Sequence, residues 1–177
     1  TVNGWHALFR HPAELARLRA DHARVPSAVE ELFSYDTPLQ MFERWVLEDI
    51  EVDGVTIPRG VEVALLFGSA NHDPAVFSTP AALDLGRETN PHISFGAGIH
   101  FCLGAPLARI ELQASMRTLL EQVPGLAPAY STEPGADHGG PSSTRRAGDL
   151  PLTDAGGAVW GPGYIIRGLD SLPVTIR

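Results

Sequence analysis

Hydrophobic positions in the first part of the chain recur at helical spacing. In residues 5–21 the apolar side chains return every three or four positions, and Pro12 divides this segment into two helical pieces. Residues 25–38 predict a third helix, which is short and buried. Pro26 is favourable in the first turn of this helix. We expect Pro38 to end it, because a proline disfavours helical backbone in the residue before it.

The middle of the chain changes to the alternating period of β-strands. Residues 45–60 are rich in β-branched side chains, and the Asp53–Gly54 pair between them favours a tight turn, so this segment predicts a β-hairpin. Residues 61–67 predict a further strand or a step from strand to helix. Residues 71–92 are rich in turn-forming residues and have little periodicity, which predicts a long meander over the surface.

A second helical period lies further along the chain. Residues 106–123 are apolar on two faces, one of which carries Leu107 and Ile110, and a helix with two apolar faces is usually buried. Residues 131–163 are rich in Gly, Pro and Ser and predict a flexible loop or insertion. Residues 164–177 are β-prone and predict a terminal hairpin. The mixture of periods predicts a mainly α fold with a small β component, in one domain.

Composition excludes several classes of function. The 177 residues carry a net charge of −8, which argues against a general nucleic-acid or membrane-surface binder, because those proteins need a basic footprint. A single cysteine cannot form an internal disulfide, so we expect a reducing, cytoplasmic location. No stretch approaches the ~20 consecutive apolar residues that span a bilayer. Because the chain does not begin with methionine, we expect a processed product or a piece of something longer.

The single cysteine, Cys102, has an unusual local sequence. Gly98 and Gly104 flank it, and a predicted helix starts directly afterwards. Glycine lets a backbone approach a large flat cofactor closely, and the N–H groups of a helix start stabilise a thiolate. These features suit a cysteine that binds a haem iron. The alternative is a free core cysteine, which composition alone favours but which leaves the glycine spacing unexplained.

The residues around Cys102 resemble the haem-binding signature of the cytochrome P450 superfamily. The shared pattern is Phe95-x-x-Gly98-x-His100-x-Cys102-x-Gly104, and its continuation resembles the bacterial soluble members. Four further segments resemble the family in the expected order: residues 26–40, 48–63, 69–77 and 166–174. The resemblance implies the family's fold and covers only its C-terminal, haem-binding part, with Thr1 at the end of the family's distal helix.

The resemblance implies a haem b site, that is, iron protoporphyrin IX. Cys102 would be the metal ligand, Phe95 would pack beside the sulfur, and His100 and Arg44 would bind the haem propionates by charge-assisted hydrogen bonds. Each residue has a plainer alternative: a core aromatic, a loop histidine bonded to backbone, and a solvated arginine beside Glu43. The implied cofactor-binding residues are Phe95, Gly98, His100, Cys102, Gly104 and Arg44.

The chain departs from the family at one structural position. Glu31 and Arg87 match two members of the family's Glu-Arg-Arg triad, but Ser34 stands where the family has its other arginine. A buried carboxylate needs cationic partners, so we expect Glu31 to have one instead of two and the meander to be anchored less firmly. The alternative is that Glu31 and Arg87 are surface charges.

Two functions from different classes follow. The resemblance implies a haem-thiolate monooxygenase, or a fragment of one, that inserts one oxygen atom from O2 into a small organic substrate. A ferredoxin or flavoprotein would supply the electrons, and Arg109 and Arg117 would offer it a local basic face unless they are merely solvated. The alternative is a truncated, non-catalytic remnant or interaction module that binds haem weakly or not at all. The other histidines do not have metal-ligand spacing.

Overall fold

The structure is a computed structural model that describes residues 1–129, 152–153, 158–161, 163 and 165–176. Three helices come first, as the hydrophobic period predicts: α1 (Val2–Arg10), α2 (Pro12–Ala20) and α3 (Val25–Tyr35), with the 3-10 turn η1 (His22–Arg24) before α3. Pro12 and Pro26 each lie in the first turn of a helix, where the missing N–H has no intrahelical partner to lose. The third helix ends before Pro38, as predicted.

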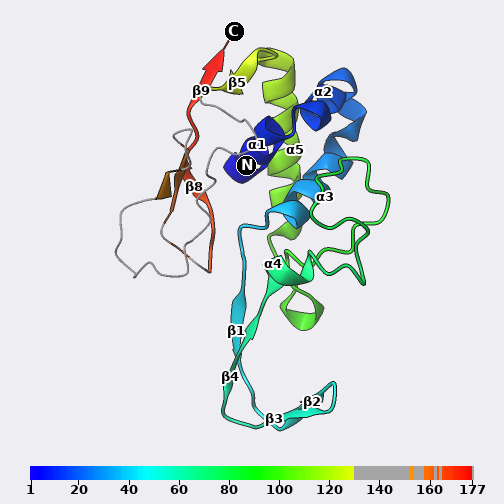
Figure 1. Cartoon of the computed structure of the whole chain (residues 1–177), viewed down its shortest axis with the longest axis vertical. Coiled ribbons are helices and arrows are strands. Elements are labelled where there is room, and N and C mark those ends of the chain that lie inside the picture. Colours follow the sequence, from blue (N-terminus) through cyan, green and yellow to red (C-terminus); the bar gives the residue numbers. More distant parts are fainter. Residues whose placement is uncertain (130–151, 154–157, 162, 164, 177) are drawn as a thin grey trace.

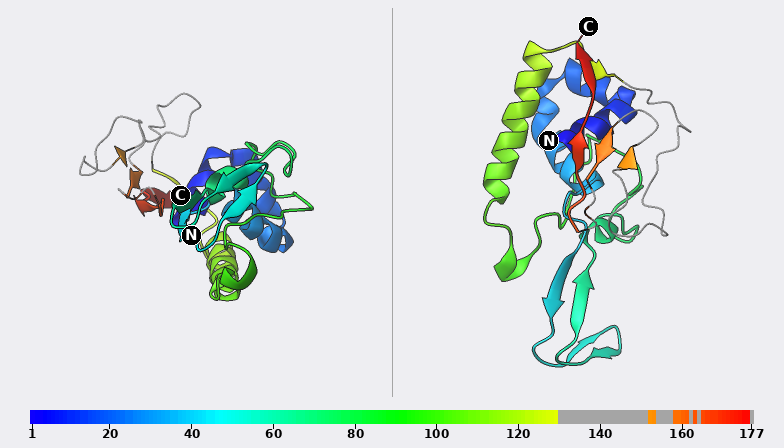
Figure 2. Two further views of the ribbon diagram at one scale, coloured as in Figure 1. Left: turned by 90° about the horizontal axis from the view of Figure 1, so that it is seen from below. Right: turned by 90° about the vertical axis from the view of Figure 1, so that its left-hand side faces the viewer.

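A two-part antiparallel ribbon follows the helices. β1 (Phe42–Trp45) pairs with β4 (Glu62–Leu65), and β2 (Ile50–Val52) pairs with β3 (Val55–Ile57) between them. The Asp53–Gly54 turn of the predicted hairpin has positive φ at both residues, 48° and 77°, as a tight two-residue hairpin turn requires. Figures 1 and 2 show this ribbon extending away from the helices.

The predicted step from strand to helix leads into the short helix α4 (Phe67–Ala70). Residues 72–97 then contain neither helix nor strand, in agreement with the predicted meander, and the 3-10 turn η2 (Gly98–His100) follows them. The long helix α5 (Ala105–Gln122) comes next. The predicted burial of one face is wrong at its start, where Leu107 and Ile110 are 59% and 65% exposed. α5 packs on the core only from Leu112 onwards, through Leu112, Met116 and Leu120.

The C-terminal strands pair differently from the predicted hairpin. β9 (Val174–Ile176) pairs with β5 (Leu126–Pro128), whereas β8 (Leu169–Ser171) pairs with β7 (Val159–Trp160), which also pairs with β6 (Leu152–Thr153). The two last strands therefore belong to different sheets. Most of the predicted loop at 131–163 lies outside the described residues; within its described part, Trp160 is buried.

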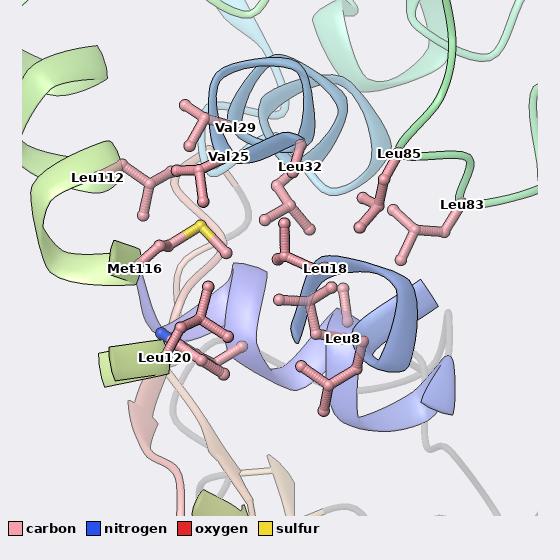
Figure 3. Packing of buried hydrophobic residues seen from close by; sticks show 14 of the residues in the cluster. Leu8, Leu18, Val25, Val29, Leu32, Leu83, Leu85, Leu112, Met116 and Leu120 are labelled. Atoms are coloured by element: carbon pink, nitrogen blue, oxygen red, sulfur yellow. The ribbon is translucent and has the colours of Figure 1, made fainter. Parts of the chain in front are cut away.

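The core lies between α1, α2, α3 and α5, and the meander closes one side of it (Figure 3). Leu8, Leu18 and Val29 are fully buried, and Leu85 of the meander packs with them. This packing fixes α3, the meander and α5 relative to one another. Within the part of the chain that the structure describes, no helix is both long and apolar enough to cross a membrane.

Candidate functional site

A cavity of about 1170 Å³ opens where the end of α3, the base of the ribbon, α4 and the loop of Cys102 meet. This volume exceeds the range of roughly 300–1,000 Å³ that is usual for small-ligand pockets. Its lining residues are Phe33, Thr37, Pro38, Leu39, Phe42, Arg44, Leu65, Leu66, Phe67, Ala70, Ile93, Ser94, Phe95, Gly96, Ala97, His100 and Cys102. Most of this lining is apolar, and a thiol, an imidazole and a guanidinium are its reactive groups.

The loop around Cys102 is held by backbone hydrogen bonds. The Cys102 N–H donates to the Phe95 carbonyl over 2.9 Å, and the Ala105 N–H, at the start of α5, donates to the Cys102 carbonyl over 3.2 Å. Gly98 has a φ of +63°, which L side chains rarely adopt, so the loop shape requires glycine there. A Cβ on Gly104 would lie 3.8 Å from the Cys102 sulfur. The loop geometry therefore requires glycine at Gly98, whereas a Cβ on Gly104 would make only an ordinary contact with the sulfur.

The structure brings four of the six predicted site residues to one cavity: Phe95, His100, Cys102 and Arg44. Cys102 is exposed, which overturns the core-cysteine alternative. Gly98 belongs to the same loop without lining the cavity, and so does Gly104. The motif predicted Phe95, His100 and Cys102, whereas Arg44, which lies 51 to 58 positions earlier in the chain, was predicted from the family resemblance, and all four line the same cavity.

Strand pairing brings Arg44 to the cavity from the ribbon. Alternate residues of a strand share a face, so Phe42 and Arg44 of β1 both line the cavity, and Leu65 of β4 pairs opposite Phe42. The Arg44 guanidinium lies 4.3 Å from the Phe42 ring centroid and donates one hydrogen bond to the Glu43 carbonyl. This contact uses one of five N–H groups, and among the described residues no other hydrogen bond occupies the rest, which can bind an anion.

A charged cluster supports Phe95. Arg109 donates to both oxygens of Glu30 over 2.7 and 2.9 Å, and its guanidinium lies 4.7 Å from the Phe95 ring centroid. His92 Nε2 lies 3.1 Å from the same carboxylate. The predicted basic face at Arg109 is therefore neutralised by Glu30, while Arg117 donates to the His22 carbonyl.

The cluster also perturbs two ionisations. Burial alone would raise the pKa of Glu30, but the hydrogen bonds from Arg109 and His92 outweigh it and hold the pKa below its ordinary 4.5. Burial lowers the pKa of His92 below its ordinary 6.5, although Glu30 acts in the opposite direction. Both groups bind protons more readily in the unfolded chain than in the folded protein.

The free energy of unfolding is therefore expected to fall as the pH drops below about 6.5, first through His92 and then, below about 4.5, through Glu30. Stability linked to a lowered pKa is present above the unfolded value and is lost on acidification. Urea unfolding measured from pH 8 to pH 4 checks this, with His92→Gln expected to flatten the profile between pH 6.5 and pH 5. An identical slope in the parent and in His92→Gln would contradict the assignment.

Glu31 and Arg87 form a buried ion pair, so the surface-charge alternative is wrong. The Glu31 side chain is 3% exposed, and Arg87 Nε donates to it over 2.9 Å. Glu31 also accepts from Asn90 Nδ2 over 2.9 Å and from the Asp84 N–H over 3.0 Å. Among the described residues Arg87 is the one cation hydrogen-bonded to Glu31, as Ser34 led us to expect, and neutral donors complete the carboxylate's shell.

A second buried network was not predicted. Asn71 is 2% exposed, and its side chain bonds to Ser94, to the Ile93 N–H and to the Ser34 carbonyl. The Ser94 hydroxyl in turn donates to the Phe33 carbonyl over 2.7 Å. In the sequence Asn71 stands in a turn-rich segment, where asparagine is an ordinary turn former, so no local signal separates it from its neighbours.

A metal site made only of His, Asp, Glu and Cys side chains has no support in the described residues, where no group of three or more such side chains could hold an ion. One of the histidines without metal-ligand spacing, His138, lies outside the described residues.

Comparison with known proteins gives a consistent result. Residues 25–123 match the family model described as Cytochrome P450. The chain is 47% identical over 119 residues to the Biotin biosynthesis cytochrome P450 of Bacillus subtilis, and 38% identical over 177 residues to the Cytochrome P450 monooxygenase PikC of Streptomyces venezuelae. These matches cover 67% and 99% of this chain.

Solved structures agree with the curated relatives. The crystal structure of P450BioI in complex with an acyl carrier protein that carries hexadec-9Z-enoic acid matches with a TM-score of 0.81 at 38% identity, over 99% of this chain. The ligand-free P450 monooxygenase TamI matches with a TM-score of 0.81 at 35% identity. The chain spans 30% and 37% of the length of the two curated relatives, and 39% and 37% of the two structures.

Proposed function

This chain belongs to the cytochrome P450 family, and we propose that it is the thiolate-bearing part of a haem monooxygenase. The observation that carries the proposal is the exposed Cys102 thiol on the wall of a large, mainly apolar cavity. The same cavity holds Arg44 and His100, the two side chains assigned to the propionates.

The residues present fit haem b. A porphyrin is a flat apolar ring with two carboxylates, so it needs broad apolar walls, a few hydrogen-bond donors at one edge and a ligand for the iron. Phe67, Leu65 and Phe95 contribute to such walls, and an arginine fork binds carboxylates well. Gly96, with a φ of +73°, puts backbone without a side chain on the cavity wall and allows close approach.

Each residue then has a role. Cys102 would hold the iron, Arg44 and His100 would neutralise the propionates, and Phe95 would shield the sulfur from water. Haem held by a thiolate supplies oxygen activation, because the electron-rich sulfur favours O–O cleavage. A small organic molecule is the proposed substrate, and a ferredoxin or flavoprotein is the proposed electron donor.

A haem titration tests the proposal. The protein is titrated with haem, reduced and exposed to carbon monoxide, and the absorption spectrum is recorded. We expect saturable binding of one haem and a strongly red-shifted Soret band, which reports thiolate ligation. An absence of haem binding would favour the alternative of a non-catalytic remnant or interaction module.

A further inference from the structure

Three walls of the cavity meet at one buried side chain, that of Asn71. The end of α3 contributes Phe33, α4 contributes Phe67, and the segment before the cysteine loop contributes Ile93 to Phe95. Asn71 follows α4 directly, and its N–H donates to the Phe67 carbonyl over 3.0 Å. The residue is thus placed between wall segments that lie far apart in the sequence.

The Asn71 amide bonds to two of these segments with both its donor and its acceptor atoms. Nδ2 donates to Ser94 Oγ over 2.9 Å and to the Ser34 carbonyl over 3.4 Å, while Oδ1 accepts from the Ile93 N–H over 2.9 Å. Ser94 Oγ passes the connection on by donating to the Phe33 carbonyl. The network has three described residues with polar side chains, and all three are buried: Asn71, Ser94 and Ser34.

The network continues to the thiol through one residue. Ser94 precedes Phe95, and the Phe95 carbonyl accepts the Cys102 N–H over 2.9 Å. A shift of Ser94 would therefore move both Phe95 and the backbone of Cys102. Deleting one partner of a buried hydrogen bond leaves the other unpaired, which weakens the whole connection more than the lost contact alone.

We propose that Asn71 and Ser94 are positioning residues that set the geometry of the Cys102 loop against α3. This inference deepens the proposed function, because a ligand atom must be held in place before its cofactor binds. The two residues do not touch the reacting atoms, and they act through the Phe95 backbone.

Hydrogen exchange in the haem-free protein tests the proposal without relying on cofactor binding. Ser94→Ala and Asn71→Ala are compared with Ser69→Ala, the matched control, which removes an exposed hydroxyl from α4 two residues before Asn71. Exchange of the Ile93 and Cys102 amides is expected to rise about tenfold or more in the first two variants and to stay unchanged in the control. Unchanged exchange at both amides in Ser94→Ala would overturn the proposal.

A second readout separates this inference from the proposed function. In haem-loaded protein we expect Ser94→Ala to weaken haem binding about tenfold and to broaden or shift the red-shifted carbon monoxide band. Ser94→Thr keeps the hydroxyl, so we expect it to bind haem with the parent's affinity and to show the parent's band. A band and affinity identical to the parent would overturn the positioning role. If the parent binds no haem, the proposed function fails, and the exchange data alone decide on the loop.

Discussion

Arg87→Met is expected to destabilise the fold by about 3–5 kcal/mol, because it leaves the Glu31 carboxylate buried without its cation. Arg87 also donates to the Ser78 and Ala82 carbonyls, so the same change removes two hydrogen bonds within the meander as well as its ion pair with α3. For a protein of this size the loss corresponds to a fall in the thermal midpoint of roughly 6–20 °C. Chemical and thermal unfolding of the haem-free protein measure it.

Arg24→Met is the matched control. Arg24 lies 3.3 Å from Asp21 on the surface, with side chains that are 40% and 50% exposed. An exposed pair of this kind contributes at most about 1 kcal/mol. If Arg87→Met costs no more than Arg24→Met, the ion pair does not anchor the meander.

A double variant isolates the buried charge. The single change Arg87→Met leaves the Glu31 carboxylate buried without a cation. Adding Glu31→Gln removes that carboxylate. We expect the double variant to be more stable than Arg87→Met alone, because an amide is less costly to bury than an unpaired charge. A double variant that loses the sum of both single effects would show that the two residues act independently.

The helical period predicted α1, α2 and α3 well because Leu8, Leu18 and Val29 of these helices pack in a single core. It failed on α5, where Leu107 and Ile110 are apolar but exposed. Ile99 and Leu103, both 98% exposed, lie in the loop that precedes this helix. Periodicity reports which residues share a face, but it does not report what covers that face.

Strand pairing exposed a second limit of local reasoning. The residues of β8 and β9 are β-prone and close in sequence, which predicts a hairpin, yet each pairs with a different partner. The partner of β9 is β5, more than 40 positions earlier, and the three residues of β5 carry a proline that argues against a strand. Long-range pairing of this kind depends on packing that no local turn signal encodes.

In the candidate site, too, some residues could be predicted from the sequence and others could not. Motif spacing predicted the cysteine loop, because glycine, histidine and cysteine at fixed offsets carry a chemical requirement. It did not predict the side chains that hold the loop, such as the Arg109–Glu30 pair, which are 79 positions apart. Support of this kind comes from ordinary polar residues that become distinctive only once they are buried and paired.

Cys102→Ser is expected to abolish the red-shifted carbon monoxide band completely while leaving the haem-free fold intact. The side chain is exposed, so its replacement should change the free energy of unfolding by no more than about 0.5 kcal/mol. The adjacent residue offers a matched control, because Leu103 is 98% exposed and does not line the cavity. Leu103→Ala should keep both the band and the affinity for haem.

Whether Cys102→Ser protein still binds haem distinguishes two ways of losing the red-shifted band. His100 lines the same cavity two residues away, and an imidazole is a common iron ligand that does not produce the thiolate band. If Cys102→Ser protein still binds haem and its band is not red-shifted, His100 is the ligand in that variant. The double variant Cys102→Ser, His100→Ala should then lose haem binding. Persistence of the red-shifted band in Cys102→Ser would contradict the proposed site, because the chain contains no other thiol to account for it.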